Sequence, residues 1–153
     1  MILIAHRGNT KGPNKELENS PQYIDKAIEE GYDVEVDLWS RDGKVFLGHD
    51  APEYQICEKW IQQRVNNLWV HCKNTQSLNF VRIYGHWDRK LKYFWHQEDD
   101  YTFTSNGFIW TYPGKPLSGC GKDICVMPEK AKYSEYEILK CWGICSDYVE
   151  KYR

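Results

Sequence analysis

The sequence has no long apolar run and no concentrated block of basic residues. Its hydrophobic stretches fall far short of the roughly 20 residues that a transmembrane helix requires, and Lys and Arg never occur more than two in a row. Twenty basic and 22 acidic side chains give a formal net charge of −2. These absences argue against a membrane span and against nucleic-acid binding. Since the first residues lead directly into a strand pattern instead of a signal peptide, we expect a cytoplasmic protein.

The six cysteines form no recognisable metal-binding pattern. No Cys-x-x-Cys occurs, and no spacing of Cys and His fits a known zinc module. We expect buried, reduced thiols, and the alternative is a disulfide or a zinc clip. Aromatic residues, in contrast, make up 15% of the chain and include seven Trp and 11 Tyr. Such rings either fill the centre of a small barrel or line a shallow sugar-binding cleft, and we favour core filling.

Strand patterns and helix patterns alternate along much of the chain. Strands are predicted at residues 2–6, 33–38, 44–48, 68–73 and 92–96, and helices from Pro21 to a stop at Gly31 and at residues 52–64 and 76–84. Shorter units follow, with strands at 101–104, 108–112, 124–127 and 143–146 and a helix at 134–141. His86 is expected at the surface. This alternation predicts an α/β fold with a parallel sheet, in one domain spanning residues 1–153.

Chemically active side chains gather where these predicted strands end. The carboxyl ends of parallel strands meet at one face of a barrel, so we expect these side chains to form one site. They are His6, Glu35, Asp37, His71, Lys73 and His96.

Glu35 and Asp37 are the candidate metal ligands. They lie two residues apart on a predicted strand and therefore share one face. Two such carboxylates repel each other unless a proton or a cation lies between them, and Mg²⁺ or Ca²⁺ suits oxygen ligands. Glu18 is either a further ligand or a group that orients one. The alternative interpretation of the pair is a solvated strand face.

His6 and His49 are the candidate proton-transfer pair. Phosphodiester cleavage requires one group to deprotonate the nucleophile and another to protonate the leaving oxygen, and imidazole ordinarily titrates near neutral pH. Arg7 offers a planar fork that matches phosphate oxygens. The pattern does not say which histidine is the acid and which is the base.

Four motifs appear in a fixed order within residues 1–50. They are Ile4-Ala5-His6-Arg7-Gly8, Glu18-Asn19-Ser20, Val34-Glu35-Val36-Asp37 and Phe46-Leu47-Gly48-His49-Asp50. Their order and residue types resemble those of the glycerophosphodiester phosphodiesterase family. In that family His-Arg-Gly closes the first strand, Glu-Asn precedes the first helix, Glu-x-Asp lies on the second strand and His-Asp follows a hairpin. Beyond residue 50 only fragments match, at residues 108–111 and 143–148.

The resemblance implies a small TIM-type (β/α) barrel with several crossover helices shortened or missing, because barrels of this type usually need about 250 residues. It also implies metal-dependent hydrolysis of a glycerophosphodiester-like substrate through a cyclic phosphate, with Lys73 neutralising phosphoryl charge. Where family members commonly have a Glu ligand, this chain has His71. An imidazole there would move the preference toward Mn²⁺ or Zn²⁺.

The expected substrate is a small-molecule or glycan-linked phosphodiester. A small barrel with short loops would have an open site, which favours a larger or more exposed substrate than a free glycerophosphodiester. His96 and Trp110 are candidate substrate contacts. Two alternatives remain: a phospholipase-D-like lyase that stops at the cyclic phosphate, and a non-catalytic phosphosugar-binding module. The sequence leaves the oligomeric state open.

Overall fold

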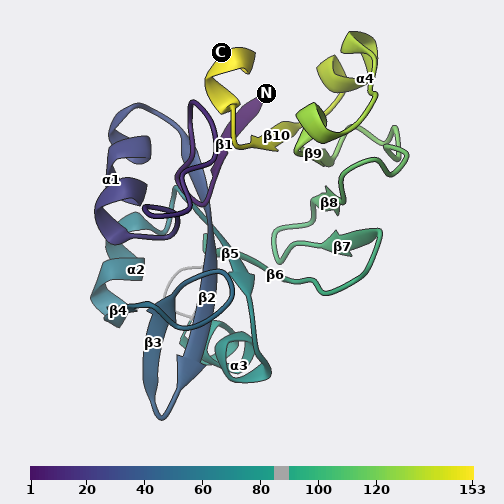
Figure 1. Cartoon of the computed structure of the whole chain (residues 1–153). Coiled ribbons are helices and arrows are strands. Elements are labelled where there is room, and N and C mark those ends of the chain that lie inside the picture. The colour runs from purple at the N-terminus through teal and green to yellow at the C-terminus, as the bar shows by residue number, and fades with distance from the viewer. Residues whose placement is uncertain (85–89) are drawn as a thin grey trace.

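The computed structural model describes residues 1–84 and 90–153, and His86 therefore lies outside the described residues. Figure 1 shows the two ends of the chain close together on one side of the molecule. The helices in the described part are α1 (Pro21–Glu29), α2 (Glu58–Arg64), α3 (Thr75–Tyr84) and α4 (Glu135–Leu139), with short 3₁₀ turns η2 (Pro128–Lys130) and η3 (Val149–Tyr152). Among these residues, no helix is long and apolar enough to cross a lipid bilayer.

One curled, ten-stranded mixed sheet forms the framework of the molecule. Its strands are β1 (Ile2–His6), β2 (Asp33–Arg41), β3 (Lys44–Leu47), β4 (Tyr54–Ile56), β5 (Leu68–Cys72), β6 (Lys92–Trp95), β7 (Tyr101–Phe103), β8 (Ile109–Thr111), β9 (Asp123–Val126) and β10 (Gly143–Ser146). In the order β6-β5-β2-β1-β10-β9-β8, each strand is parallel to its neighbours. The antiparallel strands β3 and β4 extend from β2, and β7 pairs with β8.

The prediction of an α/β TIM-type barrel is wrong. Helices accompany only the first part of the sheet, where α1 follows β1, α2 precedes β5 and α3 follows β5. From β6 to β10, the five-residue α4 is the one α-helix in the described chain. The molecule is therefore a half-barrel of mostly strands, without the helix after every strand that a TIM barrel requires.

The curl stays open between β6 and β7. In the described residues β6 pairs with β5 alone. Isolated hydrogen bonds, and not a regular strand ladder, connect β6 to the segment around β7. Thr102 Oγ1 donates to the Trp95 carbonyl oxygen at 2.7 Å, and the Ser105 amide donates to the Tyr93 carbonyl oxygen at 2.8 Å. A parallel crossover needs about a dozen residues or more, and the short segments around β7 instead form a hairpin with β8.

The segment between residues 52 and 64 also differs from its prediction. Instead of one helix, Tyr54–Ile56 forms β4, and the helix begins only at Glu58. Ile56 is buried opposite Val45 of β3. A three-residue segment is too short to distinguish the helical from the strand periodicity of apolar residues, so the pairing with β3 decides its structure.

Two apolar clusters lie on opposite faces of the sheet. Successive residues of a strand point to opposite faces, so Ala5 and Val70 pack outward against the helices, where Ile24 and Ala27 of α1 meet them. Alternating residues such as Ile4 point into the curl. There they join Trp69, Phe94, Trp110, Ile124, Val126 and Cys145. The polar residues at the carboxyl ends of the strands lie next to this inner apolar cluster.

The cysteines are all free thiols in the structure. Four are buried, and Cys57 and Cys120 are exposed. Burial raises the pKa of the Cys72 thiol to about 12, so this group is protonated at neutral pH.

Candidate functional site

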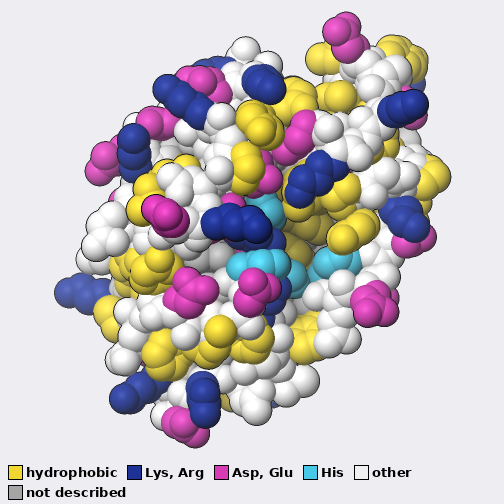
Figure 2. Space-filling model, in the orientation of Figure 1, with side chains coloured by type: hydrophobic (Ala, Val, Ile, Leu, Met, Phe, Trp, Pro, Cys, Tyr) yellow, Lys and Arg dark blue, Asp and Glu magenta, His cyan; other side chains and the backbone are white. Residues whose placement is uncertain are grey.

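A cavity of about 1020 Å³ lies at the carboxyl ends of the parallel strands. Figure 2 shows histidines gathered in the hollow, with apolar side chains inside it and basic side chains beside it. Every site residue predicted from sequence except Asp37 lines this cavity: His6, Arg7, Glu18, Glu35, His49, His71, Lys73, His96 and Trp110. Asp37 is fully buried and contacts several of them.

Strand register explains why these residues meet. His6 of β1 lies opposite Glu35 of β2, and Asp37 of β2 lies opposite His71 of β5. Because the three strands are parallel, these residues form neighbouring positions at one edge. The convergence of residues far apart in the chain follows from the parallel ladder.

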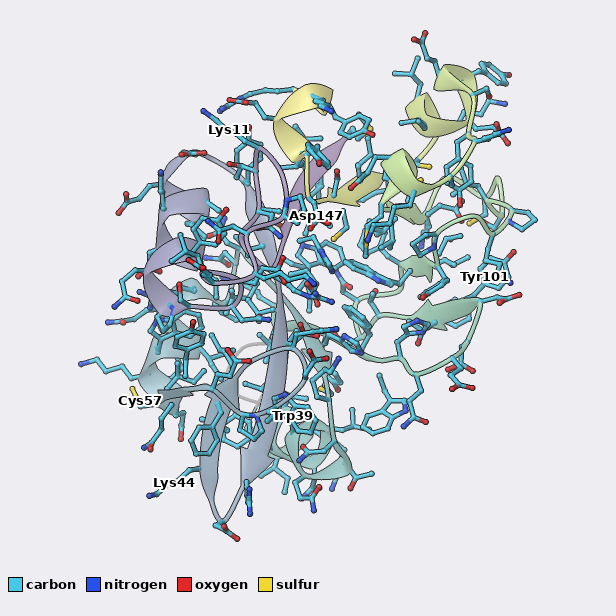
Figure 3. The ribbon with its side chains drawn as sticks, in the orientation of Figure 1. Lys11, Trp39, Lys44, Cys57, Tyr101 and Asp147 are labelled. Atoms are coloured by element: carbon cyan, nitrogen blue, oxygen red, sulfur yellow. The ribbon has the colours of Figure 1, made fainter. Side chains whose placement is uncertain are left out.

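Two glycines shape the loops that present Arg7 and His49. Gly8 has φ +89°, and a Cβ there would lie 2.8 Å from the Tyr23 ring. Gly48 has φ +151°, and a Cβ there would collide with the Ala51 carbonyl oxygen. Only glycine tolerates both the backbone angle and the close approach. The Gly48 carbonyl also accepts a 2.7 Å hydrogen bond from the indole of Trp39, which Figure 3 labels.

The Glu35 and Asp37 carboxylates are buried, with 2% and 0% of each residue exposed. Burial, together with the charge of Asp37, raises the pKa of Glu35. Burial opposes ionisation of Asp37 as well, but its contacts with His49 and His71 and the charge of Arg7 outweigh burial and hold its pKa well below the ordinary value. Asp37 therefore stays ionised to a lower pH than an ordinary aspartate, and Glu35 takes up a proton at a higher pH than an ordinary glutamate.

His6 is held by a residue from the far end of the chain. Its Nδ1 lies 2.7 Å from Asp147 Oδ1, which also accepts a 2.9 Å hydrogen bond from Asn9. Because a carboxylate accepts, His6 Nδ1 donates, and Nε2 remains to face the cavity 3.9 Å from Glu35 Oε2. Burial alone would raise the pKa of Asp147, but the hydrogen bond from His6 outweighs burial and lowers that pKa. Figure 3 labels Asp147 within the curl, next to β10.

His49 has a matching arrangement on the other side of the carboxylate pair. Its Nδ1 lies 3.2 Å from Asp37 Oδ2, and its Nε2 lies 3.3 Å from Arg7 Nη2. With Nδ1 donating to the carboxylate, Nε2 faces the cavity and accepts a hydrogen bond from Arg7 Nη2. About 40% of the His49 side chain is exposed, so a substrate or water can reach it.

Glu18, Asp37 and His49 fix the Arg7 side chain. Its Nη1 donates to Glu18 Oε2 at 3.1 Å, and its Nε lies 3.0 Å from Asp37 Oδ2. Burial opposes the charge, but Asp37 and Glu35 raise the pKa of Arg7, so the guanidinium stays cationic. Both Glu18 oxygens are engaged, since Oε1 accepts from Asn9 at 3.0 Å. Of its two predicted roles, Glu18 therefore has the geometry of an orienting group.

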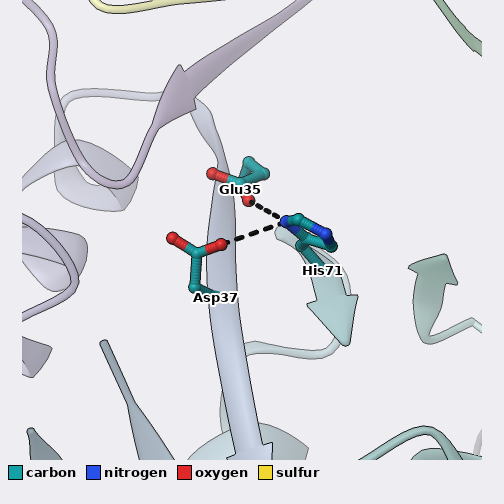
Figure 4. A group of neighbouring side chains, drawn as sticks. All are labelled: Glu35, Asp37 and His71. Atoms are coloured by element: carbon teal, nitrogen blue, oxygen red, sulfur yellow. Dashed lines mark ion pairs between the residues drawn. The ribbon is translucent and has the colours of Figure 1, made fainter. Parts of the chain in front are cut away.

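Glu35, Asp37 and His71 are the described residues grouped closely enough to hold a metal ion, with one candidate ligand atom each and all three atoms within 4.8 Å of one another. Figure 4 shows His71 Nδ1 directed at both carboxylates, at 3.0 Å from Asp37 Oδ1 and 3.8 Å from Glu35 Oε1. His71 Nε2 donates to the His96 carbonyl oxygen at 2.9 Å. That bond fixes the ring and leaves the Nδ1 lone pair as a ligand, the usual arrangement for a metal-binding histidine.

The donor set fits a divalent cation. Asp37 Oδ1 is buried and has no well-oriented hydrogen bond from the described residues. A neutral His71 would direct a lone pair at two carboxylates, which is unfavourable unless a proton or a cation lies between them. Two oxygens and one nitrogen suit Mn²⁺ or Zn²⁺ as well as Mg²⁺, and they suit Ca²⁺ less because it prefers oxygen ligands. Lys73 Nζ, 3.3 Å from Asp37 Oδ1, provides further positive charge.

Several site residues were missed by the sequence interpretation. The side chain of Asn19 makes two hydrogen bonds with Asp37: its Oδ1 accepts from the Asp37 amide at 2.9 Å, and its Nδ2 donates to Oδ2 at 3.0 Å. Asn9 and Asp147 orient His6. Phe94 and Tyr112 line the cavity beside Trp110. The matching fragment at residues 143–148 was the one available signal for Asp147.

Comparison with known proteins finds no match, whether with family models, with curated proteins or with solved structures.

Proposed function

We propose that this protein is a metal-dependent phosphodiesterase that cleaves a glycerophosphodiester-like substrate by histidine acid–base catalysis. The observation that supports this most strongly is the placement of two imidazoles around the buried carboxylate pair. His6 lies beside Glu35 and His49 beside Asp37, and each is held by a carboxylate at Nδ1. Nε2 of His6 is thereby left for proton transfer, and Nε2 of His49, which lies 3.3 Å from Arg7 Nη2, is the second proton-transfer atom of the proposal at the same cavity.

In the first step, one histidine takes the proton from a hydroxyl of the glycerol group. The hydroxyl oxygen attacks phosphorus, the bond to the leaving alcohol breaks, and the second histidine donates its proton to the leaving oxygen. A cyclic phosphate results. In the second step the now neutral second histidine takes a proton from water. The hydroxide opens the ring, and the first histidine returns its proton to the glycerol oxygen.

Arg7 and Lys73 stabilise negative charge on the phosphoryl group. The Arg7 guanidinium is partly buried and held by Glu18 and Asp37, so little reorganisation is needed during the reaction. The Lys73 ammonium lines the same cavity. Both cations lie against Asp37, which keeps them near the attacked phosphorus instead of in solvent.

Glu35, Asp37 and His71 would hold the divalent cation. When bound, this ion would act as a Lewis acid that neutralises charge on the phosphoryl oxygens. The preferred ions are Mg²⁺ and Mn²⁺, with Zn²⁺ and Ca²⁺ as further candidates.

Phosphorus NMR tests the proposal. The purified protein is incubated with a panel of glycerophosphodiesters and Mg²⁺, Mn²⁺, Zn²⁺, Ca²⁺ or EDTA, beside the His6→Ala variant. A monoester signal that requires metal and is absent from His6→Ala supports hydrolysis. A lasting cyclic-phosphate signal would instead identify a lyase. Substrate binding without product under every condition would identify a binding module and contradict the proposal.

A further inference from the structure

The cavity has a second side, formed by β6 and β8, that the proposed chemistry does not use. Phe94 and Trp110, with 2% and 5% of each residue exposed, form its floor. Their rings stack with centroids 4.4 Å apart. Tyr112 is 47% exposed at the rim, and its ring centroid lies 5.3 Å from that of His96.

This aromatic surface continues directly from the metal-binding group. The His71 ring stacks on Phe94 with centroids 5.1 Å apart and planes 9° apart, and Phe94 stacks on Trp110. A phosphodiester whose phosphorus lies near His71 would therefore place one of its two alcohol groups against these rings.

His96 presents unused hydrogen-bonding groups on this side. Both of its ring nitrogens are buried, and neither has a partner among the described residues. Buried polar atoms in folded proteins are nearly always paired, so two unpaired nitrogens in a cavity wall indicate a ligand. A neutral imidazole ring has one hydrogen-bond donor and one acceptor.

The β6–β8 side of the cavity is lined by aromatic and uncharged polar residues. Phe94, His96, Gln97, Trp110, Tyr112 and Pro113 line it, and none of these has a carboxylate. The charge of Asp99 acts on His96, but Asp99 does not line the cavity. Lys73 adds positive charge nearby. Aromatic rings also attract quaternary ammonium groups, and Glu35 and Glu129 line the same cavity, so the hydrogen bonds to His96 are what distinguish a neutral ring from choline.

We propose that the β6–β8 side of the cavity is a subsite for a neutral, hydroxyl-rich ring, a sugar or a cyclitol, that forms the alcohol group of the phosphodiester. The assignment rests on the proposed function for the position of the phosphate. The apolar face of the ring packs on Trp110 and Tyr112, as such faces do on aromatic side chains. Two ring hydroxyls satisfy the two nitrogens of His96, since a hydroxyl both donates and accepts.

Ligand-observed NMR in the presence of EDTA tests the subsite without turnover. The probes are glycerophosphoinositol and glycerophosphocholine, and dissociation constants are measured for wild type, His96→Phe and Phe103→Leu. His96→Phe keeps a ring but removes both nitrogens. Phe103→Leu is the control, because Phe103 is 74% exposed and does not line the cavity. We expect wild type and control to bind the inositol ester about tenfold more tightly than the choline ester, because one or two hydrogen bonds are worth roughly that factor.

In His96→Phe we expect the preference to fall to about twofold or less. His96→Gln, which retains a donor and an acceptor, should recover part of it and guards against misfolding of the first variant. Equal affinity for the two esters in wild type, or an unchanged preference in His96→Phe, would overturn the subsite. A clear preference without metal-dependent hydrolysis would overturn the proposed function and leave the subsite standing.

Discussion

The two parts of the described chain build the same sheet by different means. In residues 1–84, helices α1, α2 and α3 cover the outer face, and Ile24 of α1 is fully buried against it. In residues 90–153, α4 leaves Tyr136 and Leu139 exposed, at 67% and 72%. The inner face is nevertheless continuous across both parts. A parallel ladder can thus keep a site together without a helix after every strand.

The two parts also contribute different chemistry to the site. The first supplies most of the charged groups, including Glu35, Asp37 and Arg7. The second supplies aromatic rings and Asp147, which orients His6. Asp147 is itself positioned by Glu129, whose Oε1 accepts from its amide at 3.2 Å. In the proposed reaction, the second part therefore orients and selects, while the first part performs the proton transfer.

The largest effect is expected from removal of either imidazole in the first part. His6→Ala and His49→Ala should each lower kcat for phosphodiester cleavage by about 10³-fold or more, because acid–base catalysis contributes roughly 10²–10⁴-fold. Circular dichroism should show an unchanged fold. Retention of more than a tenth of wild-type kcat in both variants would contradict the proposed roles.

Core truncation sharpens the contrast between the two outer faces. Ile24→Ala, under a covering helix, should lower the free energy of unfolding by about 3 kcal/mol through lost burial and a cavity. Leu139→Ala on the exposed α4 should change it by less than about 0.5 kcal/mol. Urea denaturation measures both. Similar losses in the two variants would show that α4 covers a core as the first three helices do.

Asp147→Asn tests whether the second part orients His6. An amide can donate to His6 Nδ1 and so favour the wrong tautomer, and we expect kcat to fall about 100-fold with little change in KM. Asp42→Asn, on a turn with 90% of its side chain exposed, is the matched control and should be unaffected. Equal kcat values for both variants would contradict the proposal that Asp147 orients His6.

The smallest effect concerns metal and pH. A saturating divalent cation, at about 100 times its Kd, should stabilise the fold by roughly 2.7 kcal/mol, seen as a rise in Tm with Mn²⁺. The pKa of Glu35 is raised, so its carboxylate takes up a proton as pH falls through that value, while Asp37 stays ionised. Bound metal competes with this proton. The Mn²⁺-induced rise in Tm should therefore shrink on acidification before Asp37 titrates.

Without metal, the pH dependence of folding stability has opposite signs for Glu35 and Asp37. A raised folded-state pKa makes Glu35 favour folding as pH falls toward its ordinary unfolded value. The lowered pKa of Asp37 gives stability that is present above its ordinary value and is lost as pH falls further. Glu35→Gln should abolish both the metal-induced rise and its pH dependence. A rise in Tm that survives in this variant would place the ion elsewhere.

Local patterns predicted the first part of the fold well. The strands around His6, Glu35 and His71 appear near their predicted ranges, and α1 begins at Pro21 and ends just before Gly31. Alternation and turn residues specify such elements within a few residues of sequence. The grouping of Glu35, Asp37 and His71 also followed, since residues at the ends of neighbouring parallel strands must meet.

The errors arose where distant parts of the chain decide the outcome. The failure of the sheet to close depends on whether β6 and β7 pair, and no local pattern specifies that. Asp147 contacts a residue 141 positions away, so its role could not be read from its own neighbourhood. Asn19 has φ 62° and turns its amide to Asp37 instead of to the helix. The Glu18-Asn19-Ser20 motif in the sequence does not reveal that contact.

Imidazole rescue of the His6→Ala variant tests the central claim most directly. Phosphodiester cleavage with saturating Mn²⁺ is followed by phosphorus NMR in wild type, His6→Ala, and His6→Ala with added imidazole. The account predicts cleavage by wild type, loss of at least about 10³-fold in the variant, and a partial, imidazole-dependent return. Cleavage by His6→Ala at the wild-type rate, or no cleavage of any glycerophosphodiester by wild type, would contradict it.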